Sequence, residues 1–325
     1  MSTTAKNPGS DGSRPVIGPL AERDLPAAER IFRVAFGTFL GAPDPETFWS
    51  DRDLVYGRWR SPHVAAIGAT IDGSLVGSNF ATNWGSVGFF GPLTVLPELQ
   101  ERGIAKALLA ATVDQFDHWA LTHSGLFTFA QSAKHVALYQ KFGFHARFLT
   151  AIMFTPAQRG GAVPGTSCFS ALTFEAKAEA LHASKAVTDT LYSGLDLSEE
   201  IAAVEAQKLG DTVLVEGKGG LAAFAICHYG PRSEAGEGFC FVKFGAVRAT
   251  PSPGEDYERL LDACEALAVS MGLPNLMAGV NLARHEAYQH LVARGFRTAI
   301  QGVNMHRRNE PGYCRPGVYI IDDWR

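Results

Sequence analysis

The residues most suggestive of chemistry form a turn that leaves backbone amides free, within residues 95–109. Gly103 lacks a Cβ atom, so a ligand can approach the backbone closely there, and the small Ala105 keeps the next turn position open. The first N–H groups of a helix have no intrahelical partner and carry the positive end of the helix dipole. The turn therefore predicts a site for a phosphate group, although an ordinary strand-to-helix turn can carry the same glycine.

Strands and helices on either side must hold this turn in place. The preceding strand, residues 87–95, contains Gly91 and Pro92, and the ladder should splay there because proline donates no backbone hydrogen bond. Asp72-Gly73 suits the positive φ angles of a tight hairpin between two antiparallel strands. The other elements predicted in this half are helices at residues 24–36, 45–56, 104–121 and 133–142 and strands at residues 16–20, 63–71, 74–82, 125–130 and 148–154.

The second half of the sequence repeats this order in weaker form. Residues 139–144 (Tyr-Gln-Lys-Phe-Gly-Phe) align with residues 291–296 (Leu-Val-Ala-Arg-Gly-Phe), which indicates two copies of one fold. The predicted helices are residues 182–192, 198–208, 256–271 and 284–294, and the predicted strands are residues 212–215, 221–227, 239–247 and 275–280. A final strand-like run, residues 318–324, should pack on one of the sheets.

Glycine and proline mark the expected domain boundary at residues 156–167. We therefore expect a loose tail at residues 1–13, a first domain at residues 14–155, a linker at residues 156–167 and a second domain at residues 168–325.

Composition limits the classes of function. The 325 residues include 29 Lys and Arg against 33 Asp and Glu, so a nucleic-acid partner is not expected. Residues 1–13 lack the apolar core of a signal peptide, and no stretch reaches the roughly 18 apolar residues of a membrane helix. Five scattered cysteines show no metal-ligand spacing and suit a reducing compartment, so we expect a cytoplasmic protein without a metal site or a disulfide framework.

Residues 15–155 resemble the GCN5-related N-acetyltransferase (GNAT) superfamily. Its central signature is Arg or Gln, two residues, Gly, one residue, then Gly or Ala, and Gln100, Gly103 and Ala105 match it after a Val-x-Pro at residues 95–97. A Tyr-x-x-x-Gly-Phe element follows at residues 139–144, as in the family. The resemblance implies a mixed α/β fold with a mostly antiparallel sheet and flanking helices, here two GNAT-like domains in tandem.

The resemblance also implies acetyl-CoA as co-substrate. In the family, amides of the signature turn bind the pyrophosphate, while the strand before it pairs with the pantetheine arm. The expected cofactor-binding residues are therefore Leu93, Thr94, Val95, Gln100, Glu101, Arg102, Gly103, Ile104, Ala105, Lys106, Ser132, His135 and Tyr139.

Tyr139 matches the family's general acid, which returns a proton to the coenzyme A thiolate; the alternative is a buried core tyrosine. Ser132 matches a position that contacts pantetheine or the intermediate and is the second catalytic candidate. His135 lies four residues before Tyr139, so both side chains can share a helix face. Residues 87–95 contain no carboxylate, and the expected general base is a relayed water.

The second copy departs from the family pattern. Residues 249–256 lack the signature, and their Glu255 and Asp256 would repel a pyrophosphate. At the position that matches Tyr139, the second copy has Leu291, which cannot donate a proton. We therefore expect a degenerate second domain that supports the first and walls its substrate cleft.

Together these features predict an N-acetyltransferase that acetylates a primary amine of a small molecule, as a monomer or homodimer. The alternative is a non-catalytic acyl-CoA-binding or regulatory module. A nucleotide site of an unrelated α/β fold is disfavoured, because the strand order looks antiparallel and no Walker lysine is present. Aromatic residues that could line the acceptor cleft are Phe36, Phe39, Phe48, Trp49, Trp59 and Trp84, with His63 and Asn83 as nearby polar groups.

Overall fold

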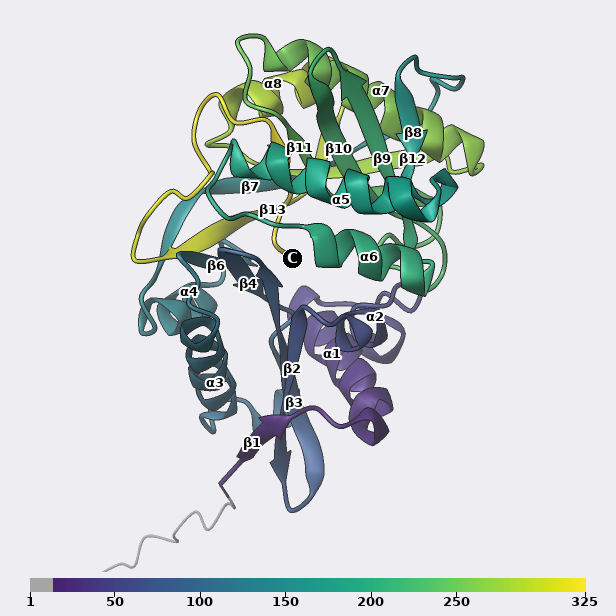
Figure 1. The fold of residues 1–325 in the computed structure, drawn as a ribbon. Helices are drawn as coiled ribbons and strands as arrows, with labels where there is room; N and C mark the ends of the chain where they lie inside the picture. Colours follow the sequence, from purple (N-terminus) through teal and green to yellow (C-terminus); the bar gives the residue numbers. More distant parts are fainter. Residues whose placement is uncertain (1–13) are drawn as a thin grey trace, which may run out of the picture.

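The computed structural model describes residues 14–325, which form one 14-stranded sheet running through both halves of the chain (Figure 1). The strands follow the order β1-β2-β3-β4-β6-β13-β7-β12-β11-β10-β9-β8, while β5 pairs with β3 and β14 with β11. Their bounds are β1 Val16–Pro19, β2 Val64–Ile71, β3 Ser74–Trp84, β4 Val87–Phe90, β5 Thr94–Val95, β6 His123–Thr128, β7 Phe144–Pro156, β8 Thr166–Cys168, β9 Gly210–Gly217, β10 Gly220–His228, β11 Phe239–Val247, β12 Asn275–Asn281, β13 Arg297–Arg307 and β14 Ile320–Ile321.

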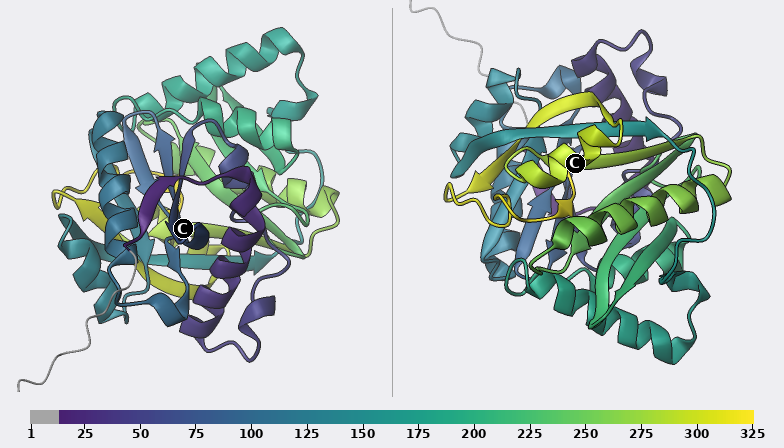
Figure 2. Two further views of the ribbon diagram at one scale, coloured as in Figure 1. Left: turned by 90° about the horizontal axis from the view of Figure 1, so that it is seen from below. Right: turned by 90° about the horizontal axis from the view of Figure 1, so that it is seen from above.

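Helices cover both faces of the sheet in each half (Figure 2). In the first half, α1 packs a buried face against β3 from one side and α3 packs against β2 and β3 from the other. In the second half, α5 and α6 lie across one face of the sheet and α7 and α8 across the other. The helices are α1 Leu25–Leu40, α2 Tyr56–Arg60, α3 Ile104–His118, α4 Ala133–Gln140, α5 Phe174–Asp189, α6 Ser198–Gln207, α7 Pro253–Ser270 and α8 His285–Ala293.

The two halves exchange strands at the centre of the sheet. β13, from the second half, pairs antiparallel with β6 of the first half, with Val303 opposite Thr128. β7, from the first half, pairs antiparallel with β12 of the second half, with Gly279 opposite Ile152. Each half therefore completes its sheet with a strand supplied by the other.

The first half opens a cleft between neighbouring strands. β4 pairs with β6 in parallel only as far as Phe90, opposite Leu126. After Pro92 the chain turns away and forms β5, which pairs with β3 instead of β6. The splay predicted at Gly91 and Pro92 is confirmed, and it leaves space between β5 and the segment that follows β6.

Several local predictions are confirmed. Asp72 and Gly73 have φ angles of 50° and 79° and join β2 to β3 as a tight hairpin. Gly143 has the positive φ expected of it, 80°, although α4 ends earlier than predicted, at Gln140, and a turn links it to this glycine. The predicted mixed α/β class is confirmed: most strand pairs are antiparallel, and β4–β6 and β11–β12 are parallel.

Other element predictions are wrong. The helix predicted at residues 45–56 is a 3-10 turn, Pro45–Thr47, followed by irregular chain before α2, because no sustained apolar face spans those residues. The helix predicted at residues 182–192 begins earlier, at Phe174, where the Thr173 hydroxyl caps it by accepting a bond from the Ala176 amide. β13 was not predicted at all.

Residues 157–165, within the predicted linker, join β7 to β8 without a helix or strand. The halves exchange β7 and β13, and their strands form one sheet. The division into a first domain at residues 14–155 and a second at residues 168–325 therefore stays a prediction. The five cysteines, all described, form no disulfide. Across residues 14–325, no helix is long and apolar enough to cross a membrane.

Candidate active site

The predicted anion-binding turn opens helix α3, as the sequence indicates. Gly103 is the residue before the helix and has a φ of 82°, a left-handed conformation that glycine adopts without a steric penalty. Glu101 is also left-handed, with a φ of 66°. A Cβ atom on Gly103 would meet nothing within 4 Å, so the space beside this turn is open. Free amides of the first helical turn therefore face open space in which an anion can bind.

The turn forms one end of a cavity of about 790 Å³ that follows the splay between β5 and β6. Most of the expected cofactor-binding residues line this cavity: Leu93, Val95, Gln100, Glu101, Gly103, Ile104, Ala105, Lys106, Ser132, His135 and Tyr139. Thr94 and Arg102 do not. Thr94 is buried on the β3 side, with its hydroxyl 3.3 Å from that of Ser78, and the Arg102 side chain is exposed.

Lysines give the turn end of the cavity a local positive charge. Lys134 donates a hydrogen bond of 2.8 Å to the side-chain oxygen of Gln100 and so links α4 to the turn. Lys106 and Lys141 also line the cavity, and Glu101 is the only Asp or Glu among the lining residues in the described part of the chain. This end therefore favours an anionic ligand although the whole chain has a net charge of −4. Sequence reasoning missed Lys134 and Lys141, since a single lysine on a helix is usually solvated.

Tyr139 lies on α4, and 7% of its surface is exposed, at the cavity wall. Its ring packs edge-on against Phe90, with centroids 5.7 Å apart. Burial raises the pKa of Tyr139, and the Thr128 side chain partly opposes that shift. The phenol is therefore protonated at neutral pH and can donate a proton into the cavity.

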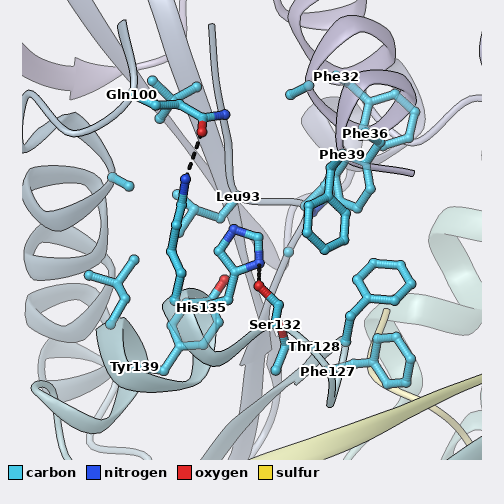
Figure 3. A pocket seen from close by; sticks show the side chains of 18 of the residues that line it. Phe32, Phe36, Phe39, Leu93, Gln100, Phe127, Thr128, Ser132, His135 and Tyr139 are labelled. Atoms are coloured by element: carbon cyan, nitrogen blue, oxygen red, sulfur yellow. Dashed lines mark hydrogen bonds between the residues drawn. The ribbon is translucent and has the colours of Figure 1, made fainter. Parts of the chain in front are cut away.

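Ser132 and His135 form a pair beside Tyr139 (Figure 3). The Ser132 hydroxyl lies 2.9 Å from His135 Nδ1. Burial, and then the neighbouring Lys134 charge, lower the pKa of His135, so its imidazole is neutral at pH 7 and can accept a proton.

Leu93 supplies a backbone donor at the splay. In the part of the chain that the structure describes, its amide makes no backbone hydrogen bond, because the segment has left β6. A carbonyl oxygen placed beside it would find an unused N–H group.

The far side of the cavity is an aromatic wall. Figure 3 shows Phe32 and Phe36 of α1 across the cavity from His135, whereas the Phe39 ring of the same helix lies 5.1 Å from the His135 ring, centroid to centroid. The wall consists of Phe32, Phe36, Phe39, Trp49, Phe127, Phe129 and Trp324.

Three of the aromatic residues proposed for the acceptor cleft lie on this wall, namely Phe36, Phe39 and Trp49. The others do not line the cavity. Trp59 donates from its ring to the Leu20 carbonyl, 2.9 Å away, Phe48 stacks on the Trp49 ring, and Trp84 is buried in the core of the second half.

A buried ion-pair network joins the second half to the splay. Arg58 donates two hydrogen bonds of 2.9 Å to the Glu234 carboxylate and one to the Gly91 carbonyl. Lys243 lies 2.8 Å from Glu234 and 3.1 Å from Glu200. Despite desolvation, the cations Arg58 and Lys243 hold the pKa of Glu234 well below its usual range. The network fixes Gly91 to the second half, and no spacing in the sequence indicated it.

His63 belongs to this network and not to the cavity: its Nε2 lies 2.9 Å from a Glu200 oxygen. The same oxygen accepts a hydrogen bond of 3.0 Å from the ring nitrogen of Trp84. Asn83 does not line the cavity either.

The corresponding cleft of the second half is filled by the chain itself. β11 pairs with β12 in parallel up to Val242, and further along it pairs with β14, with Ala246 opposite Ile320. Ile320 and Ile321 are fully buried there. Helix α7, which starts at this cleft, has Glu255 and Asp256 in its first turn. The second half therefore lacks both an open splay and a cationic turn.

The segment that fills the second cleft continues into the first cavity. After β14, Trp324 and Arg325 line the 790 Å³ cavity at its aromatic wall. The Trp324 ring nitrogen donates to Tyr313 Oη, 2.7 Å away, and its ring lies parallel to Phe89 at 6.4 Å. Sequence reasoning missed both residues, because they follow Gly103 by more than 220 positions in the sequence and reach the cavity only through the path of the folded chain.

Among residues 14–325, no group of three or more His, Cys, Asp or Glu side chains is placed to hold a metal ion.

Comparison with known proteins agrees with this geometry. Residues 28–144 match the family model described as the Acetyltransferase (GNAT) family. A search among curated proteins finds no match to the sequence.

Solved structures share the whole fold at low sequence identity. One, from Pyrococcus horikoshii and named provisionally as an acetyltransferase, has a TM-score of 0.66 at 14% identity and covers 100% of this chain and 99% of its own. A GCN5-related N-acetyltransferase from Sphaerobacter thermophilus has a TM-score of 0.57 at 13% identity, covering 92% and 96%.

A tandem GNAT protein from the clavulanic acid biosynthesis pathway has a TM-score of 0.53 at 15% identity, covering 90% of this chain and 98% of its own. The tandem arrangement of the fold is therefore confirmed. Through residues 28–144, the chain belongs to the GNAT family of acetyltransferase enzymes.

Proposed function

We propose that this enzyme transfers the acetyl group of acetyl-CoA to a primary amine of a small molecule within a ternary complex. One observation carries the proposal: a single cavity contains the amide turn before α3, the unpaired Leu93 amide and the Tyr139 phenol. The residues fit coenzyme A, since the open left-handed turn at Gly103 and the lysines beside it suit its phosphates.

In the proposed reaction the neutral amine attacks the thioester carbonyl carbon. The developing oxyanion accepts a hydrogen bond from the Leu93 amide, which forms no competing backbone bond. As the tetrahedral intermediate collapses, the C–S bond breaks and Tyr139 donates its proton to the thiolate. The proton lost by the amine leaves through water, and the neutral imidazole of His135 is a second acceptor within the cavity.

Binding of acetyl-CoA measured by calorimetry tests the proposal. Gly103→Glu should weaken the affinity at least about tenfold, because it adds a negative charge and a strained side chain to the turn. Gly73→Glu is the matched control: Gly73 has a similar φ of 79° and equally open surroundings but lies in the β2–β3 hairpin. Equal affinities in both variants would reject the phosphate site.

Transfer is tested separately by thiol release with a broad panel of amines. Binding of acetyl-CoA without release for any amine would favour the alternative function, an acyl-CoA-binding or regulatory module.

We also propose a cytoplasmic location, as monomer or homodimer. The five cysteines, none in a disulfide, support a reducing compartment.

A further inference from the structure

We propose that Arg58 and Glu234 are positioning residues for the acyl transfer: from outside the cavity they orient the Leu93 amide that receives the developing oxyanion. The inference rests on the proposed function and gives the second half of the chain, which contributes Glu234, a part in it. Neither Arg58 nor Glu234 lines the cavity, so neither side chain touches a substrate bound there.

The direction of the Leu93 amide depends on the backbone just before it. Gly91 and Pro92 are joined by a planar peptide unit, and the proline ring fixes the φ angle of Pro92. Between the Gly91 carbonyl and the Leu93 N–H group, only the Pro92 Cα–C bond is therefore free to rotate. A group that holds the Gly91 carbonyl thus restricts where the Leu93 amide can point.

The backbone is fixed on both sides of Leu93. The Gly91 N–H group donates a hydrogen bond of 2.9 Å to the Phe80 carbonyl, and the Gly91 carbonyl accepts one from Arg58. On the other side, Thr94 pairs with β3. A free amide between two such fixed points is an oxyanion donor that needs no reorganisation during the reaction.

The Arg58 guanidinium holds three partners at once. Its Nε and Nη2 donate hydrogen bonds of 2.9 Å to the two oxygens of Glu234, while Nη1 donates to the Gly91 carbonyl. Nη2 also donates over 2.6 Å to the Arg325 carbonyl. The side chains of Arg58 and Glu234 are only 3% and 6% exposed, so each charge depends on the other to stay buried. A lysine ammonium group cannot reproduce this planar fork.

Glu234 is itself anchored to the framework of the second half. One of its oxygens lies 2.8 Å from Lys243 of β11, and Lys243 lies 3.1 Å from Glu200 of α6. The network therefore ties the Gly91 carbonyl to a strand and a helix of the second half. That half has lost its own open cleft to β14, and we infer that it acts on the reaction by holding the amide of the first cleft.

Two variants test the role by thiol release and calorimetry. Arg58→Lys keeps the positive charge but loses the fork, and Glu234→Gln removes the counter-charge while keeping the side-chain size. At saturating acetyl-CoA and amine, each should lower kcat at least about tenfold, because a displaced oxyanion donor stabilises the transition state poorly. The dissociation constant of acetyl-CoA should change less than about threefold, because neither residue lines the cavity.

A second buried ion pair separates this role from stability. Arg294 Nη2 lies 2.9 Å from Glu265, both side chains are 7% exposed, and neither lines the cavity. Arg294→Lys and Glu265→Gln should lower the melting temperature, as the two test variants do, because they also weaken a buried pair. Their kcat should nevertheless stay within about twofold of the wild-type value.

A folded Arg58→Lys protein with the wild-type kcat would overturn the proposal. Equal losses of kcat in the test and control pairs would also overturn it, because the effect would then follow stability and not the position of the amide. If Arg58→Lys does not fold, Glu234→Gln decides by the same criteria. If the wild type binds acetyl-CoA but acetylates no amine, the proposed function itself fails, and the positioning role fails with it.

Discussion

The proposed general acid is a single hydroxyl group, that of Tyr139. If it protonates the leaving thiolate, Tyr139→Phe should lower kcat by about 10²-fold or more, while the dissociation constant of acetyl-CoA changes less than about threefold. The ring and its packing on Phe90 are retained in this variant, so folding should be preserved. Parallel kinetics and calorimetry measure both quantities, and an unchanged kcat would show that Tyr139 is a core residue.

His228 is a residue whose burial should make stability depend on pH. It is 1% exposed, neither ring nitrogen has a hydrogen-bond partner within residues 14–325, and burial lowers its pKa to about 4. Between pH ~6.5 and ~4 the unfolded chain therefore binds a proton that the folded chain does not, and acidification destabilises the fold.

In His228→Leu that contribution is lost, so unfolding near pH 5 should take up about one proton fewer than in the wild type. Urea denaturation at pH 7 and pH 5 measures the difference. His123, with a pKa lowered to about 4 by burial, acts in the same direction and remains in the variant. Identical pH dependence in both proteins would show that His228 is protonated in the folded state.

The backbone conformation of single residues was predictable where it depends on the local sequence. Gly103, Asp72-Gly73 and Gly143 take the left-handed φ angles that their surroundings required. The role of Arg58 was not predictable, because its partner Glu234 lies 176 residues away in the sequence. Trp324 and Arg325 were not predictable either, because they line a cavity built mainly by the first half of the chain. The spacing of residues in one sequence carries no signal for such contacts.

At the scale of elements, the two clefts differ by what occupies them. In the first half the splay is open, and in the second half β14 pairs with β11 at the equivalent position. The sequence predicted the loss of a cofactor site from Glu255 and Asp256, but not that a strand fills the space. The strand-like run predicted at residues 318–324 does pack on the sheet, as β14, Ile320–Ile321, but two residues carry no signal for the cleft that they fill.

Calorimetry should therefore give a stoichiometry of one acetyl-CoA per chain. The acidic first turn of α7 and the buried β14 both oppose binding in the second half. Saturation at two molecules per chain would contradict this account, and displacement of β14 would then be required.

At the scale of the whole molecule, the exchange of β7 and β13 makes the halves interdependent. Residues 14–156 produced alone lack the strand that pairs with β6, so they should not bind acetyl-CoA. Co-expression of residues 1–160 with residues 161–325 should restore a complex that copurifies and binds, because the cut falls in the connection between β7 and β8. Binding by residues 14–156 alone would show that the first half completes its own sheet.

The same exchange sets the order in which the site is completed during synthesis. The amide turn and Tyr139 are already made when the ribosome finishes β7 at Pro156, yet β13 ends only at Arg307. At typical elongation rates the interval lasts roughly 8 to 30 s. Throughout it, the edge of β6 destined for β13 has no permanent partner, and such edges invite pairing with other chains. The nascent chain should therefore need protection, for example by a chaperone, between the first half and the last strand.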